Sequence, residues 1–320
     1  MAYKYVFGPV MSGRLGRSLG LDLLGDRICS MDCIYCEVGS TRDLTIERKP
    51  YVPAADILTE LAAWKDEGLG ALDMVTLGGL GEPCLNSEMA DIITGAKALF
   101  PNTKIAVLTN ASLMTDEVVR RELALADVIL PSLDSLIDDE FATVNRPYKG
   151  TSPAAIADGL LEFKKGFKGK IFLEILLAEG INNSDENLEK LKDFCQRLAP
   201  DRVDVVTLTR PGTVKGVRPV DGEVLNRWRM ALESGNTRAG EKTAAAQEDI
   251  PMERIIAFIG ASLARRPQTI LQLAEALNTK PEQVRKAVEA LEKRGDVISR
   301  DDRDETFYHG TGHLIEEAAQ

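Results

Sequence analysis

The chain has 320 residues, and its 39 Lys and Arg against 50 Asp and Glu give a net charge of 39 − 50 = −11 and a pI of about 4.9. Apolar residues make up 44% of the sequence, which is typical of a globular protein and excludes a disordered chain. No apolar run reaches the ~18 residues of a membrane helix, and the N-terminus lacks the pattern of a secretory signal. We therefore expect a cytoplasmic protein that does not enter membranes, and its acidity disfavours general nucleic-acid binding.

Short apolar runs alternate with longer amphipathic runs from residue 19 to about 210. The expected strands are Leu19–Leu24, Met74–Leu80, Lys104–Asn110, Asp127–Leu133, Lys170–Leu177 and Arg202–Thr209. The expected helices are Pro53–Glu67, Ser87–Phe100, Thr115–Leu125, Ser152–Phe167 and Ser184–Leu198. Near-continuously apolar strands indicate a parallel sheet that helices cover. Six such units predict an α/β fold, namely a partial (β/α)6 TIM-type barrel over residues 1–225, with a doubly wound sheet as the alternative.

The sequence changes character after the predicted barrel. Residues 226–250 are rich in small and polar side chains and are predicted to form a linker. Beyond it, three helices and two strands are expected: Met252–Ala264, Thr269–Leu277, Pro281–Arg294, Asp296–Arg300 and Thr306–His309. Three helices followed by a hairpin predict a winged-helix domain over residues 251–320.

Three of the five cysteines, Cys29, Cys33 and Cys36, lie within eight residues. An odd cysteine count in a reducing compartment argues against a disulfide framework, so the three thiols are candidate metal ligands. Three thiolates on one loop suit a 4Fe-4S cluster with one open iron. A structural zinc site usually needs four ligands, and the only histidines, His309 and His313, lie at the far end of the chain. The remaining alternative is three unligated cysteines.

A polar or glycine-containing motif lies on or after every predicted strand. In chain order these are the cysteine loop, Gly78–Pro83, Asn110–Ser112, Ser132–Asp134, Glu174 and Thr209–Pro211. Because the carboxyl ends of parallel barrel strands meet on one rim, we expect the active site there.

The C-x3-C-x2-C loop, with Tyr35 just before its last cysteine, resembles that of the radical S-adenosylmethionine (SAM) superfamily. A closer resemblance is to iron–sulfur oxidoreductases related to the wybutosine-forming tRNA enzymes. It rests on Phe7–Val10, Gly13–Gly20, Gly79–Pro83, Leu130–Asp134, Asn145–Pro147 and Gly180–Ser184.

This resemblance implies that Cys29, Cys33 and Cys36 bind one 4Fe-4S cluster whose open iron binds SAM. An electron from a low-potential donor of the flavodoxin or ferredoxin type would cleave SAM to methionine and a 5′-deoxyadenosyl radical, which abstracts hydrogen from a small-molecule or peptide substrate. The residues expected to contact SAM or the neighbouring substrate are Tyr35, Gly78, Gly79, Gly81, Glu82, Asn110, Ser112, Ser132 and Asp134. For each of them the alternative is an ordinary packing or turn role.

Two further residues are candidates for catalysis. Cys84 follows the Gly-Glu-Pro turn, where a threonine is more usual in the family, and it is either a rim thiol or an inert buried cysteine. Arg210 is expected to bind a carboxylate or phosphate, with a salt bridge as the alternative. Arg14 and Arg17 are further substrate-side candidates, whereas Cys195 has core spacing on a predicted helix.

The predicted winged-helix domain carries ten Lys and Arg against twelve Asp and Glu, a net of −2. This balance disfavours DNA or RNA binding and favours docking of a protein or substrate. Two alternative functions remain: the same chemistry on tRNA, and a regulator whose iron–sulfur domain senses redox state or SAM.

Overall fold

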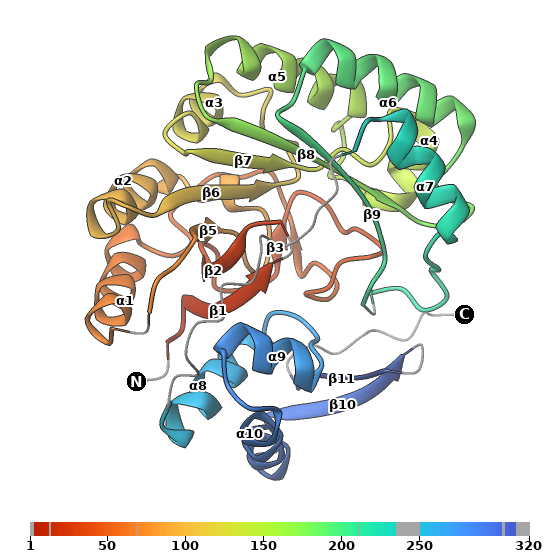
Figure 1. Cartoon of the computed structure of the whole chain (residues 1–320). Helices are drawn as coiled ribbons and strands as arrows, with labels where there is room; N and C mark the ends of the chain where they lie inside the picture. Colours follow the sequence, from red (N-terminus) through yellow and green to blue (C-terminus); the bar gives the residue numbers. More distant parts are fainter. Residues whose placement is uncertain are drawn as a thin grey trace.

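The computed structural model describes residues 3–12, 14–68, 70–210, 212–234, 250–302 and 305–311. Its centre is a seven-stranded sheet in the order β1-β2-β5-β6-β7-β8-β9 (Figure 1). The strands are β1 (Val6–Ser12), β2 (Gly16–Leu21), β5 (Met74–Leu77), β6 (Lys104–Thr109), β7 (Val128–Pro131), β8 (Lys170–Leu177) and β9 (Arg202–Thr207). The edge strand β1 runs antiparallel to β2, and the other six strands are parallel.

The six parallel strands follow one another in chain order, so the chain winds in a single direction. A doubly wound sheet would reverse its strand order at a switch point. The helices are α1 (Ala54–Asp66), α2 (Met89–Leu99), α3 (Glu117–Leu123), α4 (Asp138–Asn145), α5 (Pro153–Gly166), α6 (Asp185–Leu198) and α7 (Gly222–Ala231). The predicted α/β fold with a mostly parallel sheet is confirmed, and the arrangement is consistent with a partial barrel.

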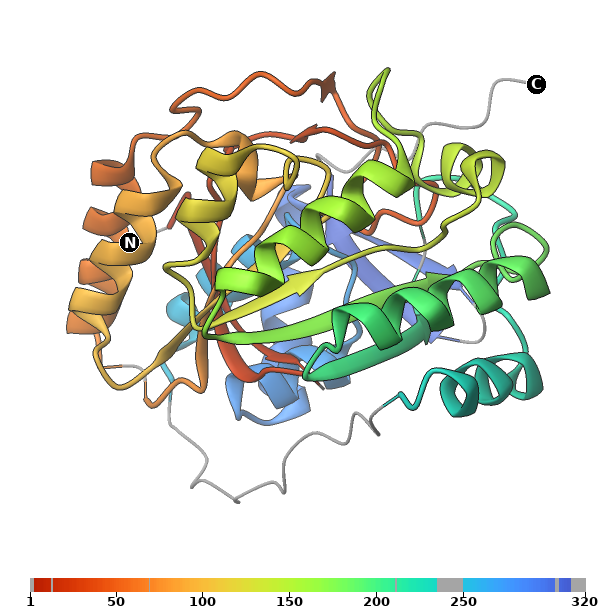
Figure 2. The same ribbon diagram turned by 90° about the horizontal axis from the view of Figure 1, so that it is seen from above.

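The two faces of the sheet differ in polarity. In β8, Ile171, Leu173 and Ile175 are fully buried among the helices, whereas Phe172 and Glu174 point the other way and are partly exposed. A small apolar cluster lies on that inner face: Leu15, Ala106, Val128 and Leu130. Figure 2 shows α5 and α6 on one side of the sheet and the C-terminal helices on the opposite side. The inner face therefore carries polar side chains such as Glu174 as well as this small apolar cluster.

Three elements near the barrel differ from the sequence prediction. Strand β1 was not expected, because Gly8, Pro9 and a register shift between Phe7 and Val10 interrupt its alternation. Helix α4 was also missed. The predicted linker is wrong at its start, because α7 runs through residues 222–231 and buries Trp228 completely. Its residues 235–249, together with Gly13, Pro211 and His313 of other motifs, lie outside the described residues.

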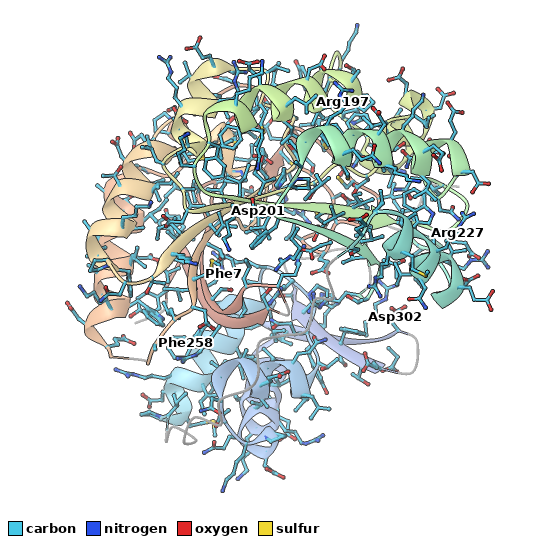
Figure 3. The ribbon with its side chains drawn as sticks, turned by 45° about the horizontal axis from the view of Figure 1, so that its top comes forward. Phe7, Arg197, Asp201, Arg227, Phe258 and Asp302 are labelled. Carbon is cyan, nitrogen blue, oxygen red and sulfur yellow. The ribbon has the colours of Figure 1, made fainter. Side chains whose placement is uncertain are left out.

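The C-terminal segment has the predicted element order. Its elements are α8 (Met252–Leu263), α9 (Ile270–Leu277), α10 (Pro281–Arg294), β10 (Val297–Asp302) and β11 (Glu305–Gly310). Helices α8 and α9 pack against β1, and Phe258 of α8 and Val6 of β1 belong to the same apolar core. Figure 3 shows Phe7 and Phe258 on the two sides of this contact. No helix in the described part of the chain is long and apolar enough to span a membrane.

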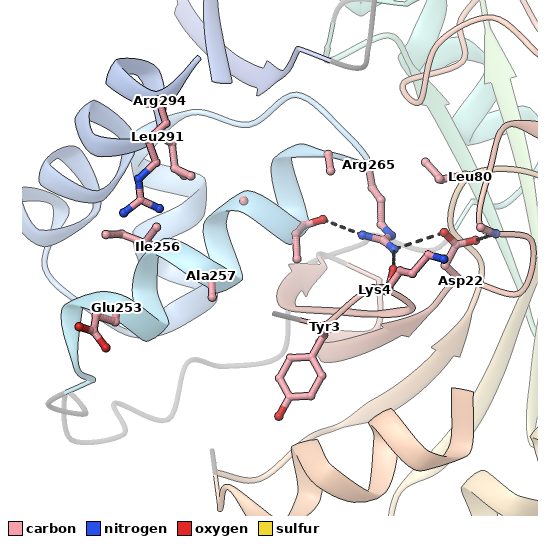
Figure 4. Close-up of a pocket in the computed structure, with 14 residues that line it drawn as sticks. Tyr3, Lys4, Asp22, Leu80, Glu253, Ile256, Ala257, Arg265, Leu291 and Arg294 are labelled. Atoms are coloured by element: carbon pink, nitrogen blue, oxygen red, sulfur yellow. Dashed lines mark hydrogen bonds and ion pairs between the residues drawn. The ribbon is translucent and has the colours of Figure 1, made fainter. Parts of the chain in front are cut away.

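The contact also contains a buried ion pair. Arg265, just after α8, lies 3.3 Å from the carboxylate of Asp22 at the end of β2, and both side chains are buried. The guanidinium donates to the carbonyl oxygens of Lys4 at 2.5 Å and Ala261 at 3.0 Å, and it stacks on the Phe7 ring. A pocket of about 490 Å³ lies beside this pair (Figure 4). The C-terminal segment is thus anchored directly to the barrel.

Candidate active site

The cysteine loop leaves the carboxyl end of β2 and is held by the end of α4. The short strand β3 (Ile28–Cys29) pairs with β4 (Asp43–Leu44), which fixes the start of the loop. Four backbone hydrogen bonds then join the loop to residues 144–148. Asp32 N donates to both Asn145 O and Arg146 O at 3.1 Å, Ile34 N donates to Val144 O at 3.0 Å, and Tyr148 N donates to Ser30 O at 2.8 Å. The loop therefore has a defined path at the rim.

Two asparagine amides point at the cysteine sulfurs. Asn110 Nδ2, after β6, lies 3.5 Å from Cys29 Sγ, and Asn145 Nδ2, at the end of α4, lies 3.5 Å from Cys33 Sγ. Each amide donates to its sulfur. Donors to cysteine sulfur stabilise the thiolate form and tune the potential of an iron–sulfur cluster. The two amide donors therefore suit an iron–sulfur cluster that is bound by the three cysteine thiolates.

Burial raises the pKa of all three thiols. Desolvation raises the pKa of Cys29 to about 12 and that of Cys36 to about 11, and it raises the pKa of Cys33 well above its usual value. Because thiolates are the metal ligands, iron binding must displace these protons. Among the described residues, no three His, Cys, Asp or Glu side chains converge on a single ion. Three thiolates that bind three different irons need not converge in that way.

The glycine turn after β5 brings its backbone directly against the cysteine loop. A Cβ at Gly81 would lie 1.7 Å from the carbonyl oxygen of Ile28, next to Cys29, so no larger residue fits there. Gly79 has φ +146°, and a Cβ there would lie 3.0 Å from the side chain of Asp22. Gly78 has room, with Leu108 at 3.6 Å. The turn thus requires glycine at two of the three predicted positions.

Glu82 joins this turn to the end of β6. Its buried carboxylate accepts hydrogen bonds from Cys84 N at 3.1 Å, Thr109 Oγ1 at 2.7 Å and Asn110 N at 2.7 Å. Desolvation raises the pKa of Glu82, and these donors partly offset the effect. The carboxylate therefore fixes the position of Asn110, whose amide contacts Cys29.

A small polar cluster lies beside Cys29. Asn110 Nδ2 donates to Ser30 Oγ at 2.9 Å, and Ser30 Oγ lies 2.7 Å from Ser112 Oγ. The structure therefore brings the predicted Asn110 and Ser112 to the cysteine loop. Ser132 is partly exposed on the inner face at the end of β7, where its backbone bridges to Glu174.

Asp134 organises the other side of the cysteine loop. Its Oδ2 accepts from Tyr35 Oη at 2.5 Å and Asn145 Nδ2 at 2.7 Å, and its Oδ1 accepts from Leu176 N at 2.8 Å. Asp134 is buried, and desolvation raises its pKa. Tyr35 and Asp134 therefore bind each other, and both position Asn145 beside Cys33.

Comparison with known proteins assigns the family. A model described as the radical SAM superfamily matches residues 26–195, which is more than half of the chain. The chain belongs to the radical SAM superfamily. Members of this superfamily typically bind a 4Fe-4S cluster and SAM, in agreement with the three cysteines and their amide donors.

Three proteins illustrate the relationship. The chain is 31% identical over 302 residues to GTPase Obg of Brachyspira hyodysenteriae, covering 92% of this chain but only 43% of that protein, so it spans less than half of that relative. It is 35% identical over 244 residues to UPF0026 protein slr1464 of Synechocystis, covering 70% of this chain and 90% of that protein. A radical SAM methyltransferase from Sphaerobacter thermophilus shares the fold, with TM-score 0.51 and 21% identity over 68% of this chain and 63% of that chain.

The two candidate catalytic residues of this radical SAM protein have clear partners. Cys84 is fully buried, and its Sγ lies 3.5 Å from Thr109 Oγ1, which favours the packing alternative. Arg210 Nη1 lies 3.1 and 3.0 Å from the two carboxylate oxygens of Glu37, the residue after Cys36. The salt bridge weighed from the sequence is therefore present, and it places Arg210 beside the cysteine loop.

Sequence reasoning did not assign Asn145, Ser30 or Glu37 their places at the site. Asn145 was singled out only as part of a motif for anion binding, and its helix was not predicted. Ser30 lies inside the cysteine spacing, which gives it a weak signal. Glu37 carries no local signal, because its partner Arg210 is distant in the chain.

Proposed function

We propose that this protein is a radical SAM enzyme that binds one 4Fe-4S cluster through Cys29, Cys33 and Cys36, cleaves SAM reductively and abstracts hydrogen from a small-molecule or peptide substrate. The observation that carries the proposal is the pair of amide donors, Asn110 to Cys29 and Asn145 to Cys33, at the rim where the parallel strands end. Structural cysteines in a core do not need such donors.

Some residues of the chain contact the cysteine sulfurs, and others hold those residues in position. When bound, the cluster and SAM supply a radical that takes hydrogen from the substrate. Gly81 and Gly79 let the backbone of the turn pack directly against Ile28 and the side chain of Asp22, which holds the turn beside the cysteine loop. Asn110 and Asn145 hold two of the sulfurs, and Glu82 and Asp134 hold those asparagines in turn.

We interpret the C-terminal segment as a winged-helix domain whose role is docking onto the barrel and its substrate. Arg265 is buried against Asp22 and Phe7 instead of facing solvent. This inward use of a cation, together with the net charge of −2, favours docking over nucleic-acid binding. A low-potential donor of the flavodoxin or ferredoxin type would supply the electron.

The test is anaerobic reconstitution with iron and sulfide, followed by reduction in the presence of SAM. We expect a 4Fe-4S signal in electron paramagnetic resonance, near four irons per chain, and formation of 5′-deoxyadenosine. Cys33→Ala should lose both, whereas Cys195→Ala, on the outer helix α6, should keep both. Formation of 5′-deoxyadenosine by Cys33→Ala would contradict the ligand assignment.

The same preparation separates the alternatives. A sensor would bind DNA in a way that depends on the cluster and would form no 5′-deoxyadenosine. A tRNA-modifying enzyme would bind tRNA with strong salt dependence. Deuterium transfer into 5′-deoxyadenosine from a labelled cell extract would identify the substrate pool.

A further inference from the structure

An ionic cluster occupies the inner face of the barrel at β8 and β9. The register places Phe172 beside Arg202 and Glu174 beside Asp204 on the same face. Arg14, from the turn between β1 and β2, pairs with Glu174. Arg202 donates through Nε at 3.0 Å and Nη2 at 2.8 Å to Asp204 Oδ2. Each of these two arginines pairs with one carboxylate on the inner face, and Arg14 remains partly exposed there.

A third pair connects this cluster to the cysteine loop. Arg210 forms its two contacts with Glu37, directly after Cys36. The segment after Arg210 packs against the loop: Thr213 Oγ1 donates to the carbonyl oxygen of Cys33 at 3.0 Å, and Val214 N donates to that of Ile34 at 3.2 Å. Arg210 therefore lies between the ionic cluster and the cysteine loop.

Arg266 brings a fourth cation from the C-terminal segment. It follows Arg265 in the connection between α8 and α9, and the charges that act on it are those of Arg210, Glu37 and Arg14. Its guanidinium has no hydrogen bond or ion pair with any described residue, and its Nε is buried. Burial and the two neighbouring arginines lower the pKa of Arg266 to about 10.

The charges of this cluster do not balance. Four arginines (Arg14, Arg202, Arg210, Arg266) face three carboxylates (Glu37, Glu174, Asp204), which leaves one positive charge in a chain of net charge −11. Glu37, the one carboxylate that acts on Arg266, already pairs with Arg210. Arg266 is partly exposed, and of its guanidinium nitrogens only Nε is both buried and without a partner. The other guanidinium nitrogens therefore reach solvent-accessible space beside Arg210 and Glu37, where an oxyanion can supply the balancing charge.

We propose that Arg266, together with Arg210 and Arg14, binds an oxyanion of the substrate, a phosphate or a carboxylate, at the inner face of the barrel beside the cysteine loop. This inference rests on the proposed radical SAM activity and adds the substrate class to it. A guanidinium binds either group through two parallel hydrogen bonds. The C-terminal segment thereby contributes a specificity-determining residue to the barrel site.

The first test is the thermal midpoint of the reconstituted, SAM-saturated full chain. Inorganic phosphate, pyrophosphate and succinate are each compared with chloride at matched ionic strength. We expect phosphate or pyrophosphate to raise the midpoint if the substrate is a phosphate ester, and succinate to raise it if the substrate is a carboxylate. In Arg266→Gln the rise should be lost, and the affinity measured by calorimetry should fall at least tenfold. Arg285→Gln, an exposed arginine on α10, is the matched control and should behave as the wild type.

The second test uses the anion-free protein. Removing a positive charge that has no carboxylate of its own and is repelled by Arg210 and Arg14 should raise the thermal midpoint of Arg266→Gln above that of the wild type, whereas removing a structural arginine would lower it. A lower midpoint in Arg266→Gln overturns the inference, and so does a wild type that responds equally to chloride and to all three oxyanions. The inference is also overturned if SAM alone raises the thermal midpoint by the same amount and the oxyanions then have no further effect. In that case the anion at Arg266 is the carboxylate of SAM.

The inference and the proposed function fail separately. Absence of 5′-deoxyadenosine from the reduced, reconstituted wild type contradicts the proposed function. Formation of 5′-deoxyadenosine without oxyanion binding contradicts only the assignment of Arg266.

Discussion

Replacement of Gly81 by alanine tests the contact between the glycine turn and the cysteine loop. The added Cβ would lie 1.7 Å from the carbonyl oxygen of Ile28, so the two segments must separate by more than 1 Å to reach the ~3 Å of a tight contact. This movement breaks the hydrogen bond of 3.1 Å from Glu82 N to Ile28 O, and it displaces Cys29. The glycine is therefore a steric requirement of the site.

The expected loss in the free energy of unfolding of Gly81→Ala has two parts. Overpacking costs ~1–3 kcal/mol, and a buried N–H group of Glu82 without its partner costs another ~1–3 kcal/mol. The free energy of unfolding of Gly81→Ala should therefore fall by about 2–6 kcal/mol. Gly78→Ala is the matched control, because its Cβ would meet Leu108 at an ordinary 3.6 Å. Its effect should stay within about 0.5 kcal/mol.

The assay combines urea unfolding under anaerobic, reducing conditions with the iron and sulfide content after reconstitution. We expect Gly81→Ala to lose both stability and iron, and Gly78→Ala to retain both. Equal stability and equal iron content in the two variants would refute the reasoning, because the turn and the cysteine loop would then not be in contact.

Three further predictions concern the surroundings of the site. Tyr35→Phe removes a charge-assisted hydrogen bond of 2.5 Å to Asp134 and should lower the free energy of unfolding by about 1.5–3 kcal/mol, measured in urea; an unchanged unfolding curve would contradict this hydrogen bond. Arg265→Ala leaves the buried carboxylate of Asp22 without its cation and should cost about 3–5 kcal/mol, whereas Asp22→Asn combined with Arg265→Met should cost less; equal losses would show that the pair is not coupled. Burial lowers the pKa of His309 below 6.5, so the native state binds fewer protons than the unfolded state in that pH range. The contribution of neutral His309 to the free energy of unfolding is therefore complete above pH 6.5 and is lost as the pH falls below it. Thermal midpoints between pH 7.5 and 5 should decline less in His309→Gln, and parallel profiles would rule out this linkage.

Local patterns determined much of the framework. Apolar strand runs and amphipathic helix runs sufficed for the six parallel strands and for five of the barrel helices, because burial on one or both faces determines these patterns. The spacing of Cys29, Cys33 and Cys36 indicated a cluster site, since three thiols on one loop have few other uses. Strand β1 and helices α4 and α7 escaped prediction, because a register shift hides the alternation of β1, and short, weakly apolar segments depend on their neighbours for stability.

Only the tertiary structure decided which side chains meet. Asn145 lies 112 positions from Cys33 in the sequence, and Arg210 lies 173 positions from Glu37, so no local pattern reports either contact. The charge of Arg266 looked ordinary in an acidic chain, yet in the fold it lies near two other arginines without a carboxylate of its own. The sequence alone determined most of the helices and strands and indicated the cysteine loop as a cluster site, because both depend on near neighbours. The amide donors to the sulfurs and the position of Arg266 near two other arginines depend on how distant segments of the chain pack.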